Sequence, residues 1–122
     1  MNHIEQQLRA YLNALGKGSL NDILSLFHES ATVVSPLYGE KNAREFYHVL
    51  LNDTIESILK PLNFFSNLDT KNGSIHFLYT WTMKNGQMVT FECVDIVEFD
   101  DKGLIKKLTI IYDTVKTRQY FG

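Results

Sequence analysis

The sequence has few of the residues that mark several common protein classes. It contains one cysteine, Cys93, among 122 residues, which excludes an internal disulfide and a metal site built from several cysteines. No apolar run is long enough to cross a membrane, and the first residues lack the pattern of a secretory signal. We therefore expect a cytoplasmic protein without a membrane partner.

Basic residues are also scarce. Twelve lysines and arginines stand against fourteen aspartates and glutamates, so the net charge is −2, and no basic stripe is present that could bind nucleic-acid phosphates. The four histidines show no metal-ligand spacing such as His-x-x-x-His. The sequence predicts no nucleic-acid partner, no metal and no cofactor.

What remains is typical of a soluble globular protein. The hydrophobic fraction is 44% and the charged fraction 21%, both ordinary values for such proteins. The length suffices for one hydrophobic core. We therefore expect residues 1–122 to form a single domain.

The first third of the sequence has the apolar spacing of helices. Apolar residues recur every three or four positions from Ile4 to Leu15, before Gly16 and Gly18 end the pattern. Ser19 is a candidate N-cap for a second helix over 20–27. The remaining expectations here are a short strand over 31–36, ended by Pro36, and a third helix over 40–51.

The rest of the chain is rich in the β-branched and aromatic residues that favour strands. Strands are expected over 62–68, 74–83, 87–99 and 104–113, separated by glycine-containing turns; the stretch from Asn52 to Asn72 gives the least clear pattern. Helices followed by an antiparallel meander predict an α+β fold, in which three N-terminal helices pack on one face of a curved, mainly antiparallel sheet.

Turn lengths predict which residues share a face of the sheet. If Asn85 and Gly86 form a two-residue turn, Lys84 pairs with Gln87, and Asp95 then faces His76. A four-residue loop in the next hairpin adds three more residues to this face. The predicted Asp95 face thus holds His76, Leu78, Thr80, Thr82, Val89, Phe91, Cys93, Asp95, Leu108, Ile110 and Tyr112.

The opposite face is apolar as well in this register. It would carry Phe77, Tyr79, Trp81, Met88, Val94 and Ile96. Three helices can cover only one face of a sheet, and a second apolar face needs a partner. We therefore predict a homodimer with Trp81, Val94 and Ile96 at its interface.

Several segments resemble a known family. "AYLNALGKGSLNDILSLFHESATVVSP" (Ala10 to Pro36), "REFY" (Arg44 to Tyr47) and "NGQMVTFECVDIVEFDDKGLI" resemble ketosteroid isomerases. Nearly the whole chain is similar to the wider SnoaL-like group of the nuclear transport factor 2-like superfamily. The resemblance implies a cone-shaped α+β barrel, in which helices close a deep apolar cavity against the sheet, commonly in a dimer.

The resemblance also implies a site. In the isomerases a helix tyrosine and a neutral aspartic acid form an oxyanion hole, and these positions match Tyr11 and Asp95. The general base falls on Ser35, Tyr47 matches a supporting tyrosine, and Tyr112 matches a cavity aromatic. A serine cannot shuttle a proton between carbons unaided, and losing a base costs about 10²–10⁴-fold in rate. Steroid isomerisation by the family mechanism is therefore not expected.

The predicted pairing of His76 with Asp95 leaves two interpretations open. In one, Asp95 is ionised and orients His76 as a general base. In the other, the two side chains form an ordinary cross-strand ion pair. Asp95 cannot at once be a neutral donor and the counterion of a protonated histidine.

Three hypotheses for function follow. The first is a pocket that binds a small hydrophobic, carbonyl-bearing molecule without turnover. The second is a proton-transfer enzyme (isomerase, cyclase or dehydratase) that uses His76, Asp95 and Tyr11, and the third is a dimeric interaction module with a vestigial pocket. The predicted pocket wall comprises Ser35, Tyr47, Leu78, Phe91, Cys93, Leu108, Ile110 and Tyr112.

Overall fold

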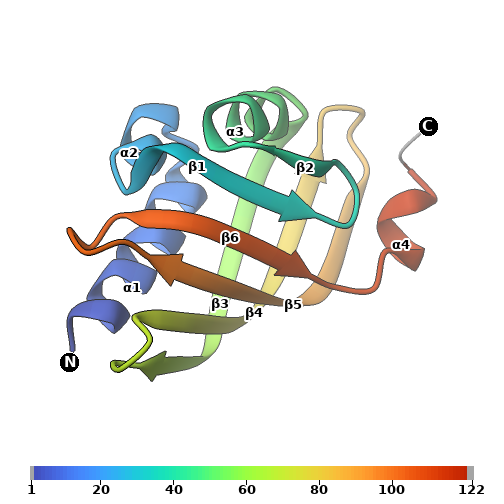
Figure 1. The fold of residues 1–122 in the computed structure, drawn as a ribbon. Helices are drawn as coiled ribbons and strands as arrows, with labels where there is room; N and C mark the ends of the chain where they lie inside the picture. Colours follow the sequence, from blue (N-terminus) through green and yellow to red (C-terminus); the bar gives the residue numbers. More distant parts are fainter. Residues whose placement is uncertain (1, 121–122) are drawn as a thin grey trace.

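A computed structural model describes residues 2–120, which form four helices and six strands (Figure 1). In chain order the elements are α1 (His3–Lys17), α2 (Leu20–Leu24), β1 (Phe27–Ser35), β2 (Gly39–Asn42), α3 (Ala43–Asn52), β3 (Thr54–Asn67), β4 (Asn72–Met83), β5 (Met88–Phe99), β6 (Ile105–Ile111) and α4 (Val115–Arg118).

The strands form one curved sheet in the order β2-β1-β6-β5-β4-β3. Strands β1 and β6 run parallel, whereas all other neighbouring pairs are antiparallel. Helices α1, α2 and α3 lie on one side of the sheet (Figure 1). The α+β fold predicted from the sequence is confirmed.

Local capping explains where the helices begin and end. The side chain of Asn2 accepts a 2.8 Å hydrogen bond from Glu5 N at the start of α1, and Gly18 ends that helix with φ of 68°. Ser19 caps α2 as predicted, but α2 stops at Leu24, so the expected helix over 20–27 was too long. The expected third helix was also too long, because residues 39–42 pair with β1 and Asn42 caps α3.

Strand β3 covers most of the segment that gave the least clear sequence pattern. It runs for 14 residues along one edge of the sheet, and most of its side chains are exposed. Its pairing with β4 is interrupted between Pro61 and Asn63, where the proline cannot donate a ladder hydrogen bond. The exposed positions and this irregularity remove the strict alternation that identifies a strand in sequence.

The register of β4 against β5 differs by one residue from the prediction. Met83 N donates to Gln87 O (2.8 Å), Gly86 N donates to Met83 O (2.9 Å), and Gly86 has φ of 88°. The turn therefore contains three residues, with glycine in the left-handed conformation. A one-residue shift turns every β4 side chain to the other face, so Asp95 stands opposite Ile75 and not His76.

The loop between β5 and β6 shifts the register by two residues and so preserves the faces. Asp95 pairs with Ile110 where Leu108 was expected, and a bulge lies between Glu98 and Phe99. An even shift leaves each side chain on its original face. Leu108 and Ile110 therefore lie on the Asp95 face as predicted.

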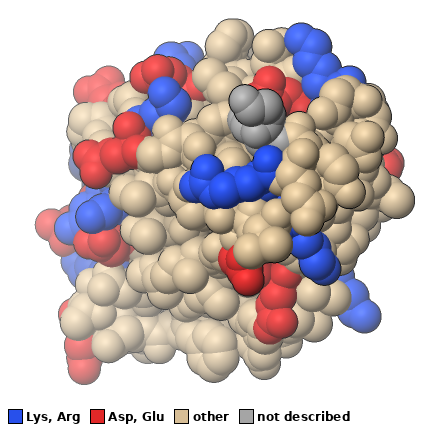
Figure 2. Space-filling view, turned by 90° about the vertical axis from the view of Figure 1, so that its right-hand side faces the viewer, with Lys and Arg blue, Asp and Glu red and all other residues tan. Residues whose placement is uncertain are grey.

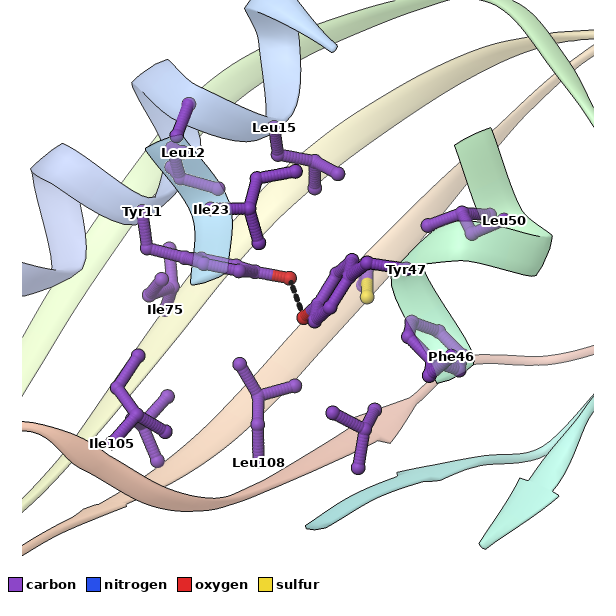
Figure 3. Close-up of a cluster of buried hydrophobic side chains, with 14 of the residues drawn as sticks. Tyr11, Leu12, Leu15, Ile23, Phe46, Tyr47, Leu50, Ile75, Ile105 and Leu108 are labelled. Carbon is purple, nitrogen blue, oxygen red and sulfur yellow. Dashed lines mark hydrogen bonds between the residues drawn. The ribbon is translucent and has the colours of Figure 1, made fainter. Parts of the chain in front are cut away.

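The core lies between this face of the sheet and the helices. Figure 3 shows side chains of α1, α2 and α3 meeting those of β4 and β6, among them the fully buried Ile23, Ile75, Ile105 and Leu108. Within residues 2–120, no helix has both the length and the apolar character required to span a membrane.

Candidate ligand pocket

A small cavity opens into the core between the helices and the sheet. Its volume is about 40 Å³, and one water molecule needs roughly 10–15 Å³ measured in the same way, so about three waters fit. Eight of its fourteen lining residues are aromatic. The lining consists of Tyr11, Leu15, Ser35, Tyr38, Phe46, Leu50, Phe77, Tyr79, Trp81, Phe91, Cys93, Asp95, Ile110 and Tyr112.

Asp95 is the one acidic residue in this lining, which contains no lysine, arginine or histidine. Its side chain projects from β5 toward the core, and the residue is 2% exposed. Burial raises the pKa of Asp95 to about 7, and a hydrogen bond from Cys93 opposes that rise. The bond runs from Cys93 Sγ to Asp95 Oδ1 over 3.4 Å. Asp95 therefore exchanges its proton near neutral pH.

Tyr11 and Tyr47 form a buried hydroxyl pair beside the carboxyl. Their hydroxyl oxygens lie 2.6 Å apart, and both rings point toward each other from α1 and α3 (Figure 3). Burial raises the pKa of both hydroxyls, and the nearby Asp95 charge raises each further. Both tyrosines therefore stay neutral over the pH range in which Asp95 titrates.

Ser35 occupies the wall position at the end of β1. Its Oγ accepts hydrogen bonds from the backbone N–H groups of Leu37 (3.2 Å) and Tyr38 (3.3 Å). This is a local turn in which the hydroxyl oxygen binds the following backbone. Ser35 thus stabilises the turn, and it supplies no titratable base to the cavity.

Two half-buried tyrosines, Tyr38 and Tyr112, lie at the cavity's less buried side. Tyr38 donates to Asp53 Oδ2 (2.8 Å). The turn that carries Tyr38 is also bound from α4, because Arg118 Nη2 donates to Pro36 O over 2.8 Å. We call this side of the cavity, formed by Tyr38 and Tyr112, the rim.

Other polar atoms of the aromatic wall bond to side chains of β3. Trp81 Nε1 donates to Thr54 Oγ1 (2.8 Å). The hydroxyls of Tyr79 and Ser57 lie 2.8 Å apart. These bonds hold the rings in place along the cavity.

The structure brings together most of the predicted pocket residues. Tyr11 and Asp95 line the cavity with five of the predicted wall residues, which are Ser35, Phe91, Cys93, Ile110 and Tyr112. Tyr47 and Leu108 are buried nearby without lining it. The prediction for Leu78 is wrong, because the register places it on the outer face of the sheet opposite Glu92.

The predicted pairing of His76 with Asp95 is also wrong. His76 lies on the outer face, where Nδ1 is 3.0 Å from Asn63 Nδ2 and Nε2 contacts the carboxylate of Glu92. Both interpretations of a His76–Asp95 pair therefore fail, since the two side chains lie on opposite faces.

The same register corrects one residue of the predicted dimer interface. Trp81 is 2% exposed and lines the cavity, so it cannot lie at an interface on the outer face. Val94 and Ile96 do lie on that outer face.

Sequence reasoning missed several lining residues for identifiable reasons. Phe77, Tyr79 and Trp81 follow once the three-residue turn is recognised. Phe46 and Leu50 fall on the apolar face expected for the third helix, whereas Tyr38 lies in a turn without periodicity. Among the described residues, no group of three or more histidines, cysteines and acids could hold a metal ion.

Comparison with known proteins agrees with this architecture. A family model for the SnoaL-like domain matches residues 8–108. The chain belongs to the SnoaL-like domain family. A search of curated proteins finds no significant match to this SnoaL-like domain.

Solved structures share the fold at low sequence identity. An NTF2-like protein of unknown function from Burkholderia pseudomallei is 18% identical with a TM-score of 0.84, covering 98% of this chain and 97% of its own. The BvnE pinacolase from Penicillium brevicompactum is 12% identical with a TM-score of 0.84, with coverages of 98% and 92%. TerC, co-crystallised with polyporic acid, is 19% identical with a TM-score of 0.82, with coverages of 97% and 97%.

Proposed function

We propose that this SnoaL-like domain binds a small, largely apolar, carbonyl-bearing molecule in the cavity, with protonated Asp95 donating a hydrogen bond to the carbonyl oxygen. The observation that carries the proposal is the buried carboxyl of Asp95 in a mainly aromatic lining. A polar group in an apolar pocket orients a ligand and selects its chemistry.

The geometry at Asp95 suits a donor. Oδ1 accepts the hydrogen bond from Cys93, so the acid proton of the neutral form belongs on Oδ2. Burial favours that neutral form up to about pH 7. A carbonyl oxygen beside Oδ2 would thus meet a donor, whereas a carboxylate ligand would meet a group that loses its proton near neutral pH.

The size of the cavity limits the ligand. Room for about three waters accepts only a molecule of a few heavy atoms as the side chains stand. A larger ligand requires Tyr38 and Tyr112 at the rim to move. The co-crystallisation of TerC with polyporic acid supports ligand binding in this fold.

A second candidate function is proton-transfer catalysis by Asp95, without His76. A general acid–base works best when its pKa lies near the working pH, and the pKa of Asp95 is about 7. The pinacolase among the structural relatives supports this alternative. Ser35 argues against the isomerase mechanism, because it offers no base opposite Asp95.

Ligand binding can be tested with cyclopentanone as the probe. We expect amide NMR shifts in residues around the cavity at about pH 6, where Asp95 is protonated. Binding should persist in Asp95→Asn, whose amide still donates, and vanish in Asp95→Val, which has no donor. His76→Gln is the matched control on the outer face and should bind like the wild type. Equal binding by Asp95→Val would overturn the role of Asp95.

The same sample separates binding from catalysis. Exchange of the α-hydrogens of cyclopentanone in D₂O reports proton transfer directly. Exchange that is faster than in buffer alone, and that is lost in Asp95→Asn, supports proton-transfer catalysis. Binding without exchange supports the non-catalytic pocket.

A further inference from the structure

We propose that the same cavity takes a second class of ligand, a small quaternary ammonium ion held between the Asp95 carboxylate and the aromatic wall. The lining contains one acid and no lysine, arginine or histidine. This goes beyond the proposed carbonyl ligand and shares with it only the cavity and Asp95.

No described group facing Asp95 balances a negative charge there. Its polar neighbours are Tyr11 from α1, Tyr47 from α3, Tyr79 from β4 and Cys93 from β5. Each is itself an acid whose pKa is raised by burial, so each remains neutral. A buried carboxylate without a counterion is costly, and an entering cation would remove that cost.

Arg118 lies close enough to Tyr112 to affect its pKa, but its hydrogen bonds go to groups other than Asp95. Arg118 donates through Nε to Thr114 Oγ1 (2.9 Å) and through Nη2 to Pro36 O (2.8 Å). The positive charge of Arg118 lowers the pKa of Tyr112, but burial raises that pKa by more. The end of the molecule seen in Figure 2 carries basic and acidic side chains among uncharged residues, so no uniformly basic surface would repel a cation.

The aromatic wall favours a quaternary ammonium over a hydrated metal ion. Tyr79, Phe91 and Tyr112 cover one another's rings, with successive centroids 5.2 Å and 4.3 Å apart. Further aromatic rings line the cavity outside this stack, those of Tyr11, Phe46 and Trp81. Aromatic rings attract organic cations through their negative faces, and aromatic cages recognise quaternary ammonium groups in this way. Tetramethylammonium is the smallest such ion, so it makes the least demand on Tyr38 and Tyr112 at the rim.

The two ligand classes should respond oppositely to pH. Binding of the cation needs ionised Asp95, whereas binding of the ketone needs the protonated acid. With a pKa of about 7, the ionised fraction rises about 30-fold between about pH 5.5 and about pH 8.5, and apparent affinity follows the competent fraction. The affinity for tetramethylammonium should rise about 30-fold over this range, while that for cyclopentanone should fall by a similar factor.

The test measures the binding of tetramethylammonium chloride by NMR shifts at both pH values. tert-Butanol is the neutral probe of similar shape, and sodium chloride controls for ionic strength. We expect tetramethylammonium to bind at the higher pH with about 30-fold weaker binding at the lower, and to lose binding in Asp95→Asn. Asp69→Asn, which removes an exposed carboxylate far along the sequence, is the matched control and should bind like the wild type.

A second readout on the wild type does not depend on any variant folding. In weak buffer slightly below pH 7, cation binding should release a proton, because it ionises Asp95. Binding that is independent of pH, equal for tert-butanol, or unchanged in Asp95→Asn would overturn the inference. If cyclopentanone binds and tetramethylammonium does not, the inference fails and the proposed function stands. If tetramethylammonium binds and cyclopentanone does not, the inference stands and the proposed carbonyl ligand fails.

Discussion

The thiol of Cys93 donates a 3.4 Å hydrogen bond to Oδ1 of Asp95, two residues along the same face of β5. Burial, and then the charge of Asp95, raises the pKa of Cys93 well above its usual range. The thiol therefore stays protonated, and Cys93 acts as a donor to the carboxyl rather than as a nucleophile.

The first prediction concerns stability against pH. The pKa of Asp95 rises from 3.8 to about 7 on folding, so the folded state binds one proton more than the unfolded state between these values. Stability should therefore fall as pH rises through this window, by about 4 kcal/mol at 1.36 kcal/mol per pKa unit. Below about pH 4 the group is protonated in both states and contributes no slope.

Chemical denaturation of wild type and Asp95→Asn at a series of pH values measures this effect. The difference in unfolding free energy should move in favour of Asp95→Asn as pH rises from about 4 to about 8. Asp69→Asn, at an exposed position, should show no such trend. If the unfolding free energies of wild type and Asp95→Asn changed with pH in parallel, the carboxyl of Asp95 would not be buried without a counterion.

The second prediction concerns the hydroxyl pair of Tyr11 and Tyr47, which lie 2.6 Å apart in the core. Changing either to phenylalanine leaves the other hydroxyl buried without its partner, which costs about 1–3 kcal/mol. The double variant removes both hydroxyls and should cost less than the sum of the two single changes. A double-mutant cycle by urea denaturation measures the coupling, and strictly additive values would refute it.

The third prediction concerns His76 on the outer face. Its contact with Glu92 is partly solvent-exposed, and such pairs contribute about 0–1 kcal/mol. His76→Gln and Glu92→Gln should therefore reduce stability by no more than about 1 kcal/mol and leave ketone binding unchanged. If His76→Gln lost ketone binding while its NMR spectrum showed an intact fold, His76 would have to contribute to the binding site.

The fourth prediction contrasts two glycines. A Cβ at Gly73 would lie 2.8 Å from Ile4 Cγ2 and 3.0 Å from Leu8 Cδ1, so Gly73→Ala should cost about 1–3 kcal/mol by overpacking α1 against β4. Gly16 lies exposed within α1 with open space around it. Gly16→Ala should stabilise by about 0.5–1 kcal/mol. If Gly73→Ala and Gly16→Ala shifted the melting temperature in the same direction, the close packing of α1 against Gly73 would be contradicted.

The fifth prediction concerns self-association, and the homodimer is proposed on the outer face. Val94 and Ile111 stand opposite each other there, and Ile96 (37% exposed) and Ile111 (53% exposed) present apolar surface beside them. We expect sedimentation of the wild type to give a dimer and Ile96→Glu to shift it to monomer, because a buried unpaired charge is costly. Leu68→Glu, in an exposed turn, should leave the dimer intact. A monomeric wild type would refute the proposal.

Helix faces and the fold class were predictable from the sequence because they depend on local spacing. Ile4, Leu8 and Tyr11 are buried on α1 as their three- and four-residue spacing predicted. Asp95 stood out because a carboxyl among alternating apolar residues of a strand must face the core. Its burial on the core face of the sheet therefore followed from the pattern of β5, whereas the cavity beside it was implied by the family resemblance.

The partner of Asp95 across the sheet was assigned from turn length, and that assignment was wrong. The pattern of β4 by itself favours the observed face, because large apolar residues alternate with mainly polar ones and are buried at every second position. The assignment depended on a turn of two or three residues around Gly86, and both fit an Asn-Gly sequence. A register shift of one residue thus decides whether His76 faces the pocket or the outer surface of the sheet.

The position of α4 has a consequence for how the domain can be connected. Arg118 holds α4 to Pro36, in the same turn as the rim residue Tyr38, while Asn85 Nδ2 donates to the carbonyl of Tyr120 over 3.2 Å. Helix α1 begins at the opposite end of the sheet (Figure 1). Polypeptide fused after α4 would therefore start close to the turn that carries Tyr38, where it could restrict or extend access to the cavity, whereas a fusion ahead of α1 would start far from that turn.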